Sequence, residues 1–497
     1  MTLRKWILIS LIFAMVAGCG GPWNSGDRVL VQKCTYDNGF TSPNRYDVVV
    51  FKYPKTPMDD NTPKNYIKRL LGLPGELLAI FFGRLYHWTP KQGEAPPFDD
   101  RNALDANGKK VNPNELWRDQ FLHTTDEKTR KWFEEGKFEI LRKPPHVMMA
   151  LRRIVYDNDY QAADLKKINL HRWDPSPNGS WKNDQTTGFV NDGKSTDEVA
   201  WIHYQHLLRP DGALGARKDI EPMLILDTLD YNTGQLKDSD NARFFQDIYS
   251  YAHWVGDLMI ECNVEVTDPK GEFWFELSKG QDRFQARWDL ASGNCTLLRV
   301  GANKQTTELA VKTTRVKGLG NYMLRLANID ARLTVWVDGD LPFGDGKEYS
   351  PPEILSAKDI EAGLTWEKIE SRRGPTKNDL NRPASIGSKG GAVKVTHLRL
   401  WRDTYYRTNT TGVDFKNHSP HNNPLRRDDW SKPERWDELR KEYDYLTMYV
   451  QPGHYLCLGD NSQASSDSRD WGLVPERLML GRALLVYYPF DRVGRIR

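Results

Sequence analysis

Apolar and polar residues alternate in short segments along much of the chain. Near the N-terminus, GDRVLVQK (26–33) and RYDVVVF (45–51) are rich in Val and are bounded by Gly, Pro and Asn. NYIKRLLGLPGE (65–76) follows a polar loop that contains proline and ends in the turn signal Gly-Leu-Pro-Gly. A period of two residues with turn residues between the segments predicts β-strands.

A longer series of the same pattern fills residues 220–405. Segments such as DLMIECNVEV (257–266) and AVKVTHLRLWRDTYY (392–406) alternate apolar and polar positions, which predicts a sandwich of antiparallel sheets. The hairpin LRLANIDARLTVWVDG (324–339) is similar to the one found in lectin-like jelly rolls of the concanavalin or laminin-G type. Those folds often bind sugars, although a fold alone does not establish binding.

Two cysteines and three tryptophans of this region allow predictions about a disulfide and about the core. Cys262 and Cys295 both fall on predicted strands, and they either form a disulfide across the sandwich or remain separate thiols. For Trp274, Trp288 and Trp336 we expect packing in the core, because large aromatic side chains dominate protein interiors.

The pattern changes on both sides of the predicted sandwich. Residues 90–215 are polar and rich in Trp, Pro, Asp and Lys, with helical spacing in the segments 126–138 and 146–165. We expect an accessory region with helical and irregular parts there, and residues 406–449 form a connector.

The length and composition indicate more than one domain and give no sign of nucleic-acid binding. The chain has 497 residues and a net charge of +3, with 28% charged and 39% hydrophobic residues, so it exceeds the usual size of a single core. Lys and Arg are balanced by Asp and Glu, which argues against a nucleic-acid partner. Five cysteines are too few for a disulfide scaffold, and we expect neither a metal nor a cofactor.

The first nineteen residues have the features of a secretory leader. Arg4 and Lys5 precede an uncharged apolar segment, which ends in small residues before Cys19. The sequence VAGC (16–19) resembles the lipobox of bacterial lipoproteins, whose cysteine is lipidated; an uncleaved N-terminal anchor is the alternative. Either outcome anchors the protein in the membrane of a bacterial cell envelope, with its bulk on the non-cytoplasmic side.

Lys68 lies inside an apolar segment, between Ile67 and Leu70–Leu71. Burial disfavours the charged ammonium and lowers the pKa of a lysine, and a neutral amine is a general base. The alternative is an exposed Lys-Arg pair on an edge strand, since lysine is almost never fully buried.

Four motifs in order carry a resemblance to a family. SGDRVLVQK, RYDVVVF, NYIKRLLGLPGE and GDNSQASSDSRDWG (459–472) resemble the corresponding segments of the type I signal peptidases, serine endopeptidases with a Ser-Lys dyad. The resemblance covers residues 22–85 and 450–497. It implies a signal-peptidase-type β domain, formed by residues 20–85 and 450–497, that is split by a large insertion, so that the whole fold is mainly β.

The resemblance also implies roles for single residues. Lys68 matches the general base, and Ser465 matches the hydroxyl that orients its amine. Asp467 is expected to pair with Arg469 and to hold the loop beside the site. Arg69, the neighbour of Lys68, is expected on the opposite side of the strand as a solvated charge without a chemical role.

The segment expected to hold the nucleophile departs from the family pattern. It reads AGCGGPWNSGD (17–27) and has no serine at the family position. With a one-residue deletion Cys19 takes the place of that serine, and a thiol can act as nucleophile, but a lipidated cysteine cannot. Ser25 is the sole nearby hydroxyl, two residues before Asp27.

These observations leave alternative functions open. The first is a signal-peptidase-like endopeptidase that acts on secreted preproteins at the membrane surface with an altered nucleophile segment. The second is a catalytically inactive, lipid-anchored envelope protein whose inserted sandwich binds a polysaccharide or a protein. A start codon upstream of Met1 is a further alternative, against which the leader at Met1 argues.

Overall fold

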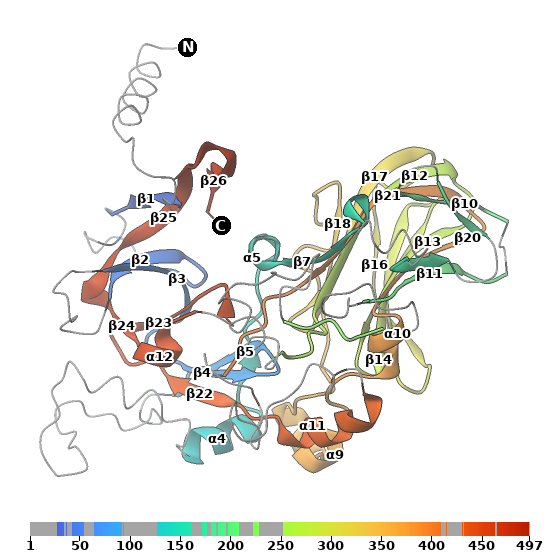
Figure 1. Ribbon diagram of the computed structural model, residues 1–497. Helices are drawn as coiled ribbons and strands as arrows, with labels where there is room; N and C mark the ends of the chain where they lie inside the picture. The colour runs from blue at the N-terminus through green and yellow to red at the C-terminus, as the bar shows by residue number, and fades with distance from the viewer. Residues whose placement is uncertain are drawn as a thin grey trace, which may run out of the picture.

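Figure 1 shows the computed structural model of the protein, in which two lobes lie side by side. One lobe holds the strands nearest both ends of the chain, and we call it the terminal domain. The other holds the strands of the middle of the chain, and we call it the sandwich. The structure describes residues 27–33, 36, 42–53, 64–91, 93, 127–161, 171–175, 180–184, 187–194, 197–207, 222–227, 252–408, 414, 430, 432–462 and 465–496.

The larger sheet of the terminal domain is built from both ends of the chain. Its strand order is β1 (Arg28–Gln32), β25 (Met479–Tyr488), β2 (Val48–Lys52), β3 (Asn65–Gly72), β23 (His454–Leu458) and β24 (Val474–Pro475), with β26 (Gly494–Arg495) beside β25. β25 pairs with β1 on one side and with β2 on the other. β25 thus stands between β1 and the other two N-terminal strands, so the two ends of the chain complete one sheet.

A smaller sheet completes the terminal domain. Its order is β22 (Leu446–Tyr449), β4 (Leu77–Phe81), β5 (Arg84–Trp88) and β6 (Glu139–Ile140). The helices α4 (Glu127–Glu134) and α11 (Trp436–Glu442) contribute Trp132, Phe133, Trp436 and Leu439 to a core shared with this sheet. The residues expected to be a connector, 406–449, therefore include a helix and a strand of the terminal domain.

The sandwich consists of two antiparallel sheets around the largest apolar core. We call the one containing β12 the first sheet and the one containing β13 the second sheet. The first sheet has the order β19 (Lys347–Glu348), β18 (Arg332–Val337), β17 (Gly320–Ile329), β12 (Leu258–Asp268), β21 (Ala392–Arg402), β10 (Phe189–Asp192) and β9 (Trp181–Asn183), with β7 (Arg153–Asp157) beside β21. The second has the order β16 (Thr306–Thr313), β15 (Asn294–Val300), β14 (Asp282–Asp289), β13 (Glu272–Lys279), β20 (Ala384–Lys389), β11 (Ala200–Tyr204) and β8 (Trp173–Pro175). Three short helices, α8 (Ala357–Glu361), α9 (Trp366–Glu370) and α10 (Lys377–Asn381), lie between β19 and β20 in the chain.

The region expected to be accessory contributes strands to the sandwich. Five strands of this region, β7 to β11, belong to the two sheets of the sandwich. Among the described residues of the segment 146–165, the helical spacing corresponds to α5 (Pro145–Leu151) and to the short 3-10 helix η1 (Asn158–Tyr160), with β7 between them. Val155 and Tyr156 are buried in the core of the sandwich, so pairing with β21 prevails over the helical pattern at this point.

The cysteines do not form the disulfide considered above. Cys262 on β12 and Cys295 on β15 are buried free thiols in strands of different sheets, where they pack as small apolar side chains. Trp288 is fully buried in the core of the sandwich, as expected. Trp336 is also buried but packs outside that core, while Trp274 is only partly buried.

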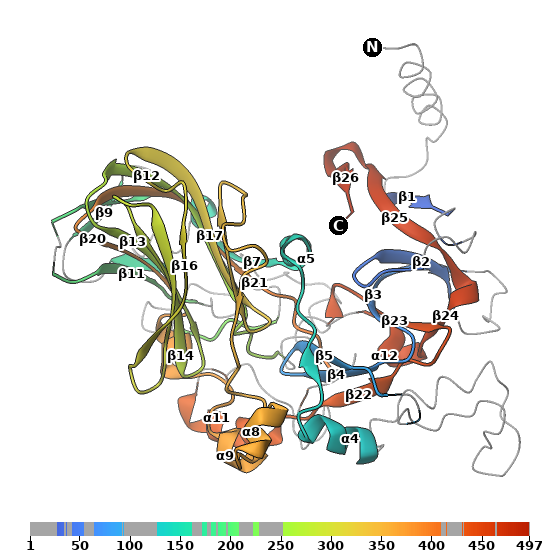
Figure 2. The same cartoon turned by 180° about the vertical axis from the view of Figure 1, so that it is seen from behind.

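Buried ion pairs join the terminal domain to the sandwich. Arg84 on β5 contacts Asp257 at 2.8 Å. Lys143, which follows β6, contacts Asp330 at 2.8 Å and Asp403 at 2.9 Å. All five side chains are at least nine-tenths buried. Removing one partner of such a pair leaves an uncompensated buried charge, so these contacts hold the two lobes in a defined arrangement, which Figure 2 shows from behind.

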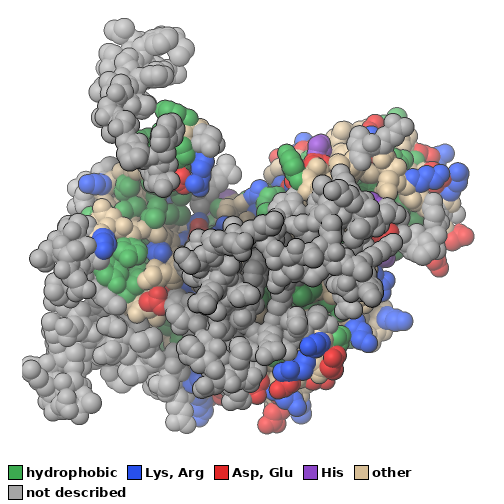
Figure 3. Space-filling view, viewed as in Figure 1, with side chains coloured by type: hydrophobic (Ala, Val, Ile, Leu, Met, Phe, Trp, Pro, Cys, Tyr) green, Lys and Arg blue, Asp and Glu red, His purple; other side chains and the backbone are tan. Residues whose placement is uncertain are grey.

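Exposed apolar side chains gather on the terminal domain, where Figure 3 shows hydrophobic surface beside β1 and β25. Among the described residues, five of the nine large apolar side chains that are exposed lie on this lobe: Leu30, Ile67, Tyr487, Phe490 and Val493.

No helix in the part of the chain that the structure describes is long and apolar enough to span a membrane.

Candidate active site

The centre of the candidate site is a contact between two residues that lie far apart in the sequence. Lys68 is on β3, which pairs with β2 and β23, and Ser465 lies in the loop after β23. The Lys68 Nζ atom is 2.8 Å from the Ser465 Oγ atom. The alternative of a solvated lysine on an edge strand is wrong, because β3 is an inner strand of its sheet.

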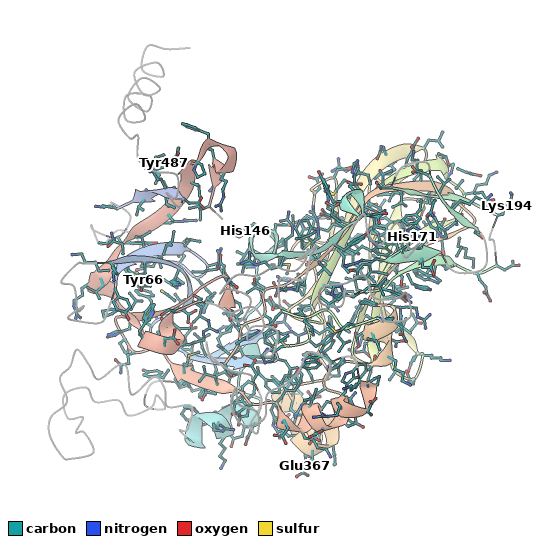
Figure 4. All side chains as sticks on the ribbon, in the orientation of Figure 1. Tyr66, His146, His171, Lys194, Glu367 and Tyr487 are labelled. Atoms are coloured by element: carbon teal, nitrogen blue, oxygen red, sulfur yellow. The ribbon has the colours of Figure 1, made fainter. Side chains whose placement is uncertain are left out.

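Aromatic rings form one wall of the pocket around the Lys68 amine. Tyr66, labelled in Figure 4, precedes Lys68 by two residues on β3, and its ring centroid is 5.8 Å from the Nζ atom. The Tyr66 ring stacks on Tyr53 at 4.9 Å and meets Trp471 edge-on at 6.2 Å. Trp471 is fully buried. These rings exclude water from one side of the amine.

Burial lowers the pKa of Lys68 below its ordinary value, because a partly desolvated ammonium is less stable than the neutral amine. The positive charge of Arg469 lowers this pKa further, while the nearby carboxylates, Asp467 foremost, act in the opposite direction. The lowered pKa of Lys68 therefore agrees with the prediction from its apolar neighbours.

Gly459 allows Ser465 to approach Lys68. A Cβ atom at position 459 would lie 1.9 Å from the Ser465 Oγ atom and 3.4 Å from the Lys68 Nζ atom. Separations below 3.0 Å do not occur for real Cβ atoms, so no other residue fits here without movement of Ser465. Gly459 stands in the motif GDNS, but no pattern in the sequence signals this close approach.

Asp467 and Arg469 hold the loop after β23 in place through hydrogen bonds. The Asp467 carboxylate accepts hydrogen bonds from the Gly459 backbone N–H at 2.9 Å and from Arg469 Nη2 at 2.7 Å. Arg469 also donates to the Arg407 carbonyl oxygen at 2.9 Å and to the Ser462 Oγ atom at 2.8 Å. All of these groups, Gly459 included, are buried. The predicted Asp-Arg pair thus connects the loop to the end of the insertion.

The expectation that Arg69 is a solvated charge is wrong. Arg69 points to the other side of β3 from Lys68, as strand alternation requires, but its side chain is buried. It donates two hydrogen bonds of 2.8 Å to the Asp460 carboxylate and a third of 2.9 Å to the Tyr46 carbonyl oxygen. A buried guanidinium needs such a partner, and Asp460 lies one residue after Gly459.

Arg407 and Arg153 are positions that sequence reasoning missed. The Arg407 backbone N–H donates to the Ser462 Oγ atom at 2.9 Å, and its guanidinium is paired with Asp227 at 2.8 Å. Arg153 on β7 donates to the Asp460 carbonyl oxygen at 2.9 Å. No short motif signals these contacts, because they join segments that only the tertiary structure brings together.

The two nucleophile candidates, Cys19 and Ser25, lie outside the described residues. The described part of the chain contains one group of carboxylates close enough to bind a metal, formed by Asp257, Asp330 and Asp403. Lys143 and Arg84 already neutralise these carboxylates. They are the junction residues between the lobes and are not part of the Lys68 site.

A split β domain in which a half-buried lysine amine contacts the hydroxyl of a supporting serine is the arrangement expected from the four motifs. The family model described as "Signal peptidase, peptidase S26" matches residues 22–132 and 403–488. The two segments match a divergent type I signal peptidase of this family, and an insertion separates them. The resemblance predicted from four motifs and the mainly β fold are both confirmed.

Curated relatives match only a short segment. The probable signal peptidase I-2 of Synechocystis sp. is 46% identical over 52 residues, which is 10% of this chain and 24% of that protein. Signal peptidase I of Buchnera aphidicola is 42% identical over 53 residues, or 11% of this chain and 17% of that protein. The chain therefore spans less than a quarter of the length of either relative.

Solved structures match the chain only at low scores. The carbohydrate binding module CBM66 from Bacillus subtilis has a TM-score of 0.25 at 10% identity, covering 47% of this chain and 96% of that one. Galectin LEC-6 of Caenorhabditis elegans has a TM-score of 0.18 at 13% identity, covering 30% of this chain and 82% of that one. Scores this low carry no argument about the ligand.

Proposed function

We propose that this protein is a signal peptidase I-like endopeptidase that cleaves secreted preproteins at the membrane surface, with Lys68 as the general base. The observation that carries the proposal is the 2.8 Å contact between the Lys68 Nζ atom and the Ser465 Oγ atom. A lysine can act as a base near neutral pH only if its pKa is lowered, and burial lowers the pKa of Lys68.

The proposed reaction needs one proton acceptor and one nucleophile. The neutral Lys68 amine takes the proton of the nucleophile, the Ser25 hydroxyl or the Cys19 thiol, as that atom attacks the scissile carbonyl carbon. The peptide C–N bond then breaks, and the Lys68 ammonium returns the proton to the leaving amine. Water repeats the same steps on the acyl-enzyme and restores the free side chain.

Ser465, Asp467 and Arg469 act as positioning residues in this scheme. The Ser465 hydroxyl fixes the direction of the Lys68 amine. Asp467 and Arg469 fix the backbone at Gly459, against which Ser465 packs. None of the three exchanges a proton with the substrate in the proposed steps.

Placement at a membrane surface agrees with the apolar side chains on the terminal domain. Ile67 on β3 is 43% exposed and adjoins Lys68, and Leu30 on β1 is 49% exposed. Phe490 and Val493, near the C-terminus, are more than half exposed. An apolar surface of this kind favours contact with the lipid boundary. We propose an N-terminal anchor in a bacterial envelope membrane, with the site on the non-cytoplasmic side.

The test is cleavage of a preprotein by the full-length protein in detergent micelles. Lys68→Met removes the amine but keeps most of the side-chain volume, so we expect loss of cleavage without loss of the fold. Lys52→Met on the adjacent strand β2 is the matched control, because Lys52 is exposed and should leave the rate unchanged. Equal rates for Lys68→Met and wild type would refute the role of Lys68.

The nucleophile is assigned by a second pair of variants. Ser25→Ala abolishes cleavage if the hydroxyl attacks, and Cys19→Ala abolishes it if the thiol attacks. A protein that cleaves at the wild-type rate when both residues are replaced would refute the proposed nucleophile segment.

A second candidate function is that of a lipid-anchored envelope protein without turnover. It is favoured by the segment 17–27, which has no serine at the family position and places Cys19 in a lipobox-like sequence. Intact mass spectrometry of protein from native membranes tests it. A diacyl or triacyl mass on an N-terminal Cys19, together with no cleavage by wild type, would support this function and refute the peptidase.

A further inference from the structure

One half of the outer face of the first sheet of the sandwich is open and polar. Figures 1 and 2 both place this sheet, with β7, β12, β17 and β21, on the side of the sandwich nearer the terminal domain. A hollow of about 400 Å³ lies on β12, β17 and β21, and Glu261, Asn263, Arg325, His397 and Arg399 help to line it. This polar hollow lies on the insertion and outside the segments that match the signal peptidase family.

The hollow is crossed by a row of charged residues of alternating sign. In register across four strands, Asp157 lies opposite Arg399, Arg399 opposite Glu261, and Glu261 opposite Arg325. The row is linked by ion pairs, since Arg399 Nε is 2.7 Å from Asp157 and Arg325 Nη2 is 2.6 Å from Glu261. The next position in register is Trp336, over whose ring the Arg325 guanidinium lies at 5.4 Å.

The other half of the same face is covered. Met148 of α5 packs with Met259, Ala327 and Ile329 of the sheet. These residues alternate along β12 and β17 with core residues, so they share the outer face with Glu261 and Arg325. The protein therefore covers the apolar half of the face with α5. In the charged row Asp157, Glu261 and Arg325 are buried, and Arg399 is partly exposed at the hollow.

A strained residue stands at the edge of the row. His397 has a backbone φ of 52°, in the left-handed region that non-glycine residues rarely adopt, and it lies where the register between β12 and β21 shifts. This bulge directs the imidazole over the open half, where its Nδ1 atom is 2.6 Å from Asp159. Bulges and strained residues gather at functional sites because they re-aim side chains.

The charges around the hollow cancel. Three guanidinium groups stand against three carboxylates: Arg152, Arg325 and Arg399 against Asp157, Asp159 and Glu261. A charged ligand would have to displace one partner of an existing pair and leave a partly buried charge without a counterion. A neutral ligand rich in hydroxyl groups can add hydrogen bonds to the paired groups without separating them.

We propose that the open half of this sheet is a binding site for a neutral, hydroxyl-rich ligand with the chemistry of a glycan chain. The Asn263 amide, the His397 imidazole and the exposed edge of Arg399 supply its hydrogen bonds. The site goes beyond the proposed peptidase activity, because among the described residues no hydrogen bond or ion pair joins these three residues to Lys68 or Ser465. It rests on the second candidate function, that of a lipid-anchored envelope protein, and adds the location of the site on the sandwich and the class of ligand.

The experiment measures binding of oligosaccharides to the full-length protein by isothermal titration calorimetry. The probes are neutral tetrasaccharides of β-1,4-linked N-acetylglucosamine, β-1,4-linked glucose and α-1,4-linked glucose, with a hyaluronan tetrasaccharide as the anionic probe. We expect at least one neutral probe to bind, and the anionic probe to bind at least about tenfold more weakly. Asn263→Ala and His397→Gly should each weaken the neutral complex by about tenfold, the value of one or two hydrogen bonds.

The two variants separate a binding role from a structural one. His397→Gly relieves the strain of a positive φ, so the variant should unfold at the same or a higher temperature than wild type while it loses affinity. Lys304→Gly is the matched control, because Lys304 also has a positive φ, 64°, but lies in an exposed turn between β15 and β16. It should keep wild-type affinity.

Several outcomes overturn the proposal. Binding of the anionic probe alone would show an anion site, and no binding of any probe would show that the charged row is structural. Unchanged affinity in both Asn263→Ala and His397→Gly would place the ligand elsewhere. None of these outcomes bears on cleavage by Lys68, which the peptidase assay tests separately.

Discussion

Replacement of Gly459 by alanine tests the geometry of the site more directly than removal of any catalytic group. The new Cβ atom would stand 1.9 Å from the Ser465 Oγ atom and 2.5 Å from the Ser465 Cβ atom. Both distances are far inside van der Waals contact, so Ser465 must move. Because the Ser465 Oγ atom contacts Lys68 at 2.8 Å, movement of Ser465 breaks the hydrogen bond that orients the amine.

The size of the effect follows from these contacts. One inserted methyl group in a close-packed site costs about 1–3 kcal/mol of the free energy of unfolding, and the lost hydrogen bond lies within that range at about 1 kcal/mol. We expect Gly459→Ala to unfold at lower denaturant concentration than wild type by this amount. If the protein cleaves preproteins, a misdirected base should also lower kcat/KM by about 10²-fold.

The assays are urea denaturation followed by tryptophan fluorescence, and preprotein cleavage in micelles. Gly494→Ala is the matched control, because its nearest contact to a new Cβ atom is 3.9 Å away, and it should behave as wild type. The double variant Gly459→Ala with Ser465→Gly removes the clashing side chain, so stability should recover while cleavage stays low. A Gly459→Ala variant as stable as Gly494→Ala would refute the packing of Ser465 against Gly459.

Further predictions concern the charges of the site, the anchor and the junction between the lobes. Because burial lowers the pKa of Lys68 and only the neutral amine is a base, kcat/KM should rise with pH to a plateau, with a midpoint below that of free lysine, about 10.4; a rate that falls over this range would contradict it. Asp460→Asn leaves Arg69 buried with a neutral partner and should cost about 1–3 kcal/mol in urea denaturation; an unchanged midpoint would contradict the pair. Cys19→Ser should release the protein from membranes in a fractionation experiment, and retention there would contradict lipid anchoring. Lys143→Met leaves Asp330 and Asp403 buried without their cation and should cost about 3–5 kcal/mol at pH 8. The cost should be smaller at pH 5, because burial raises the pKa of Asp403 to about 7 and this carboxyl group then takes up a proton; a cost independent of pH would contradict this account.

The sequence by itself determined the local features of this protein. The alternation of apolar and polar residues located β1, β2 and β3, because strand periodicity depends only on neighbouring residues. The apolar neighbours of Lys68 indicated the direction of its pKa. Asp467 and Arg469 are two residues apart, so a contact between them needs only a turn. The family followed from four short motifs, since each of them is read without reference to the rest of the chain.

Only the tertiary structure decided which distant groups meet. The Lys68 and Ser465 side chains are 397 positions apart, and without the family resemblance no local pattern connects them. Arg69 was expected in solvent but is buried, because its partner Asp460 arrives from the other end of the chain. Cys262 and Cys295 are free thiols, one in each sheet of the sandwich, and only the tertiary structure shows whether two such side chains come within bonding reach. Segments 153–157 and 173–204 joined the sandwich because partner strands were available there, and strand pairing is a property of both strands and not of either sequence alone.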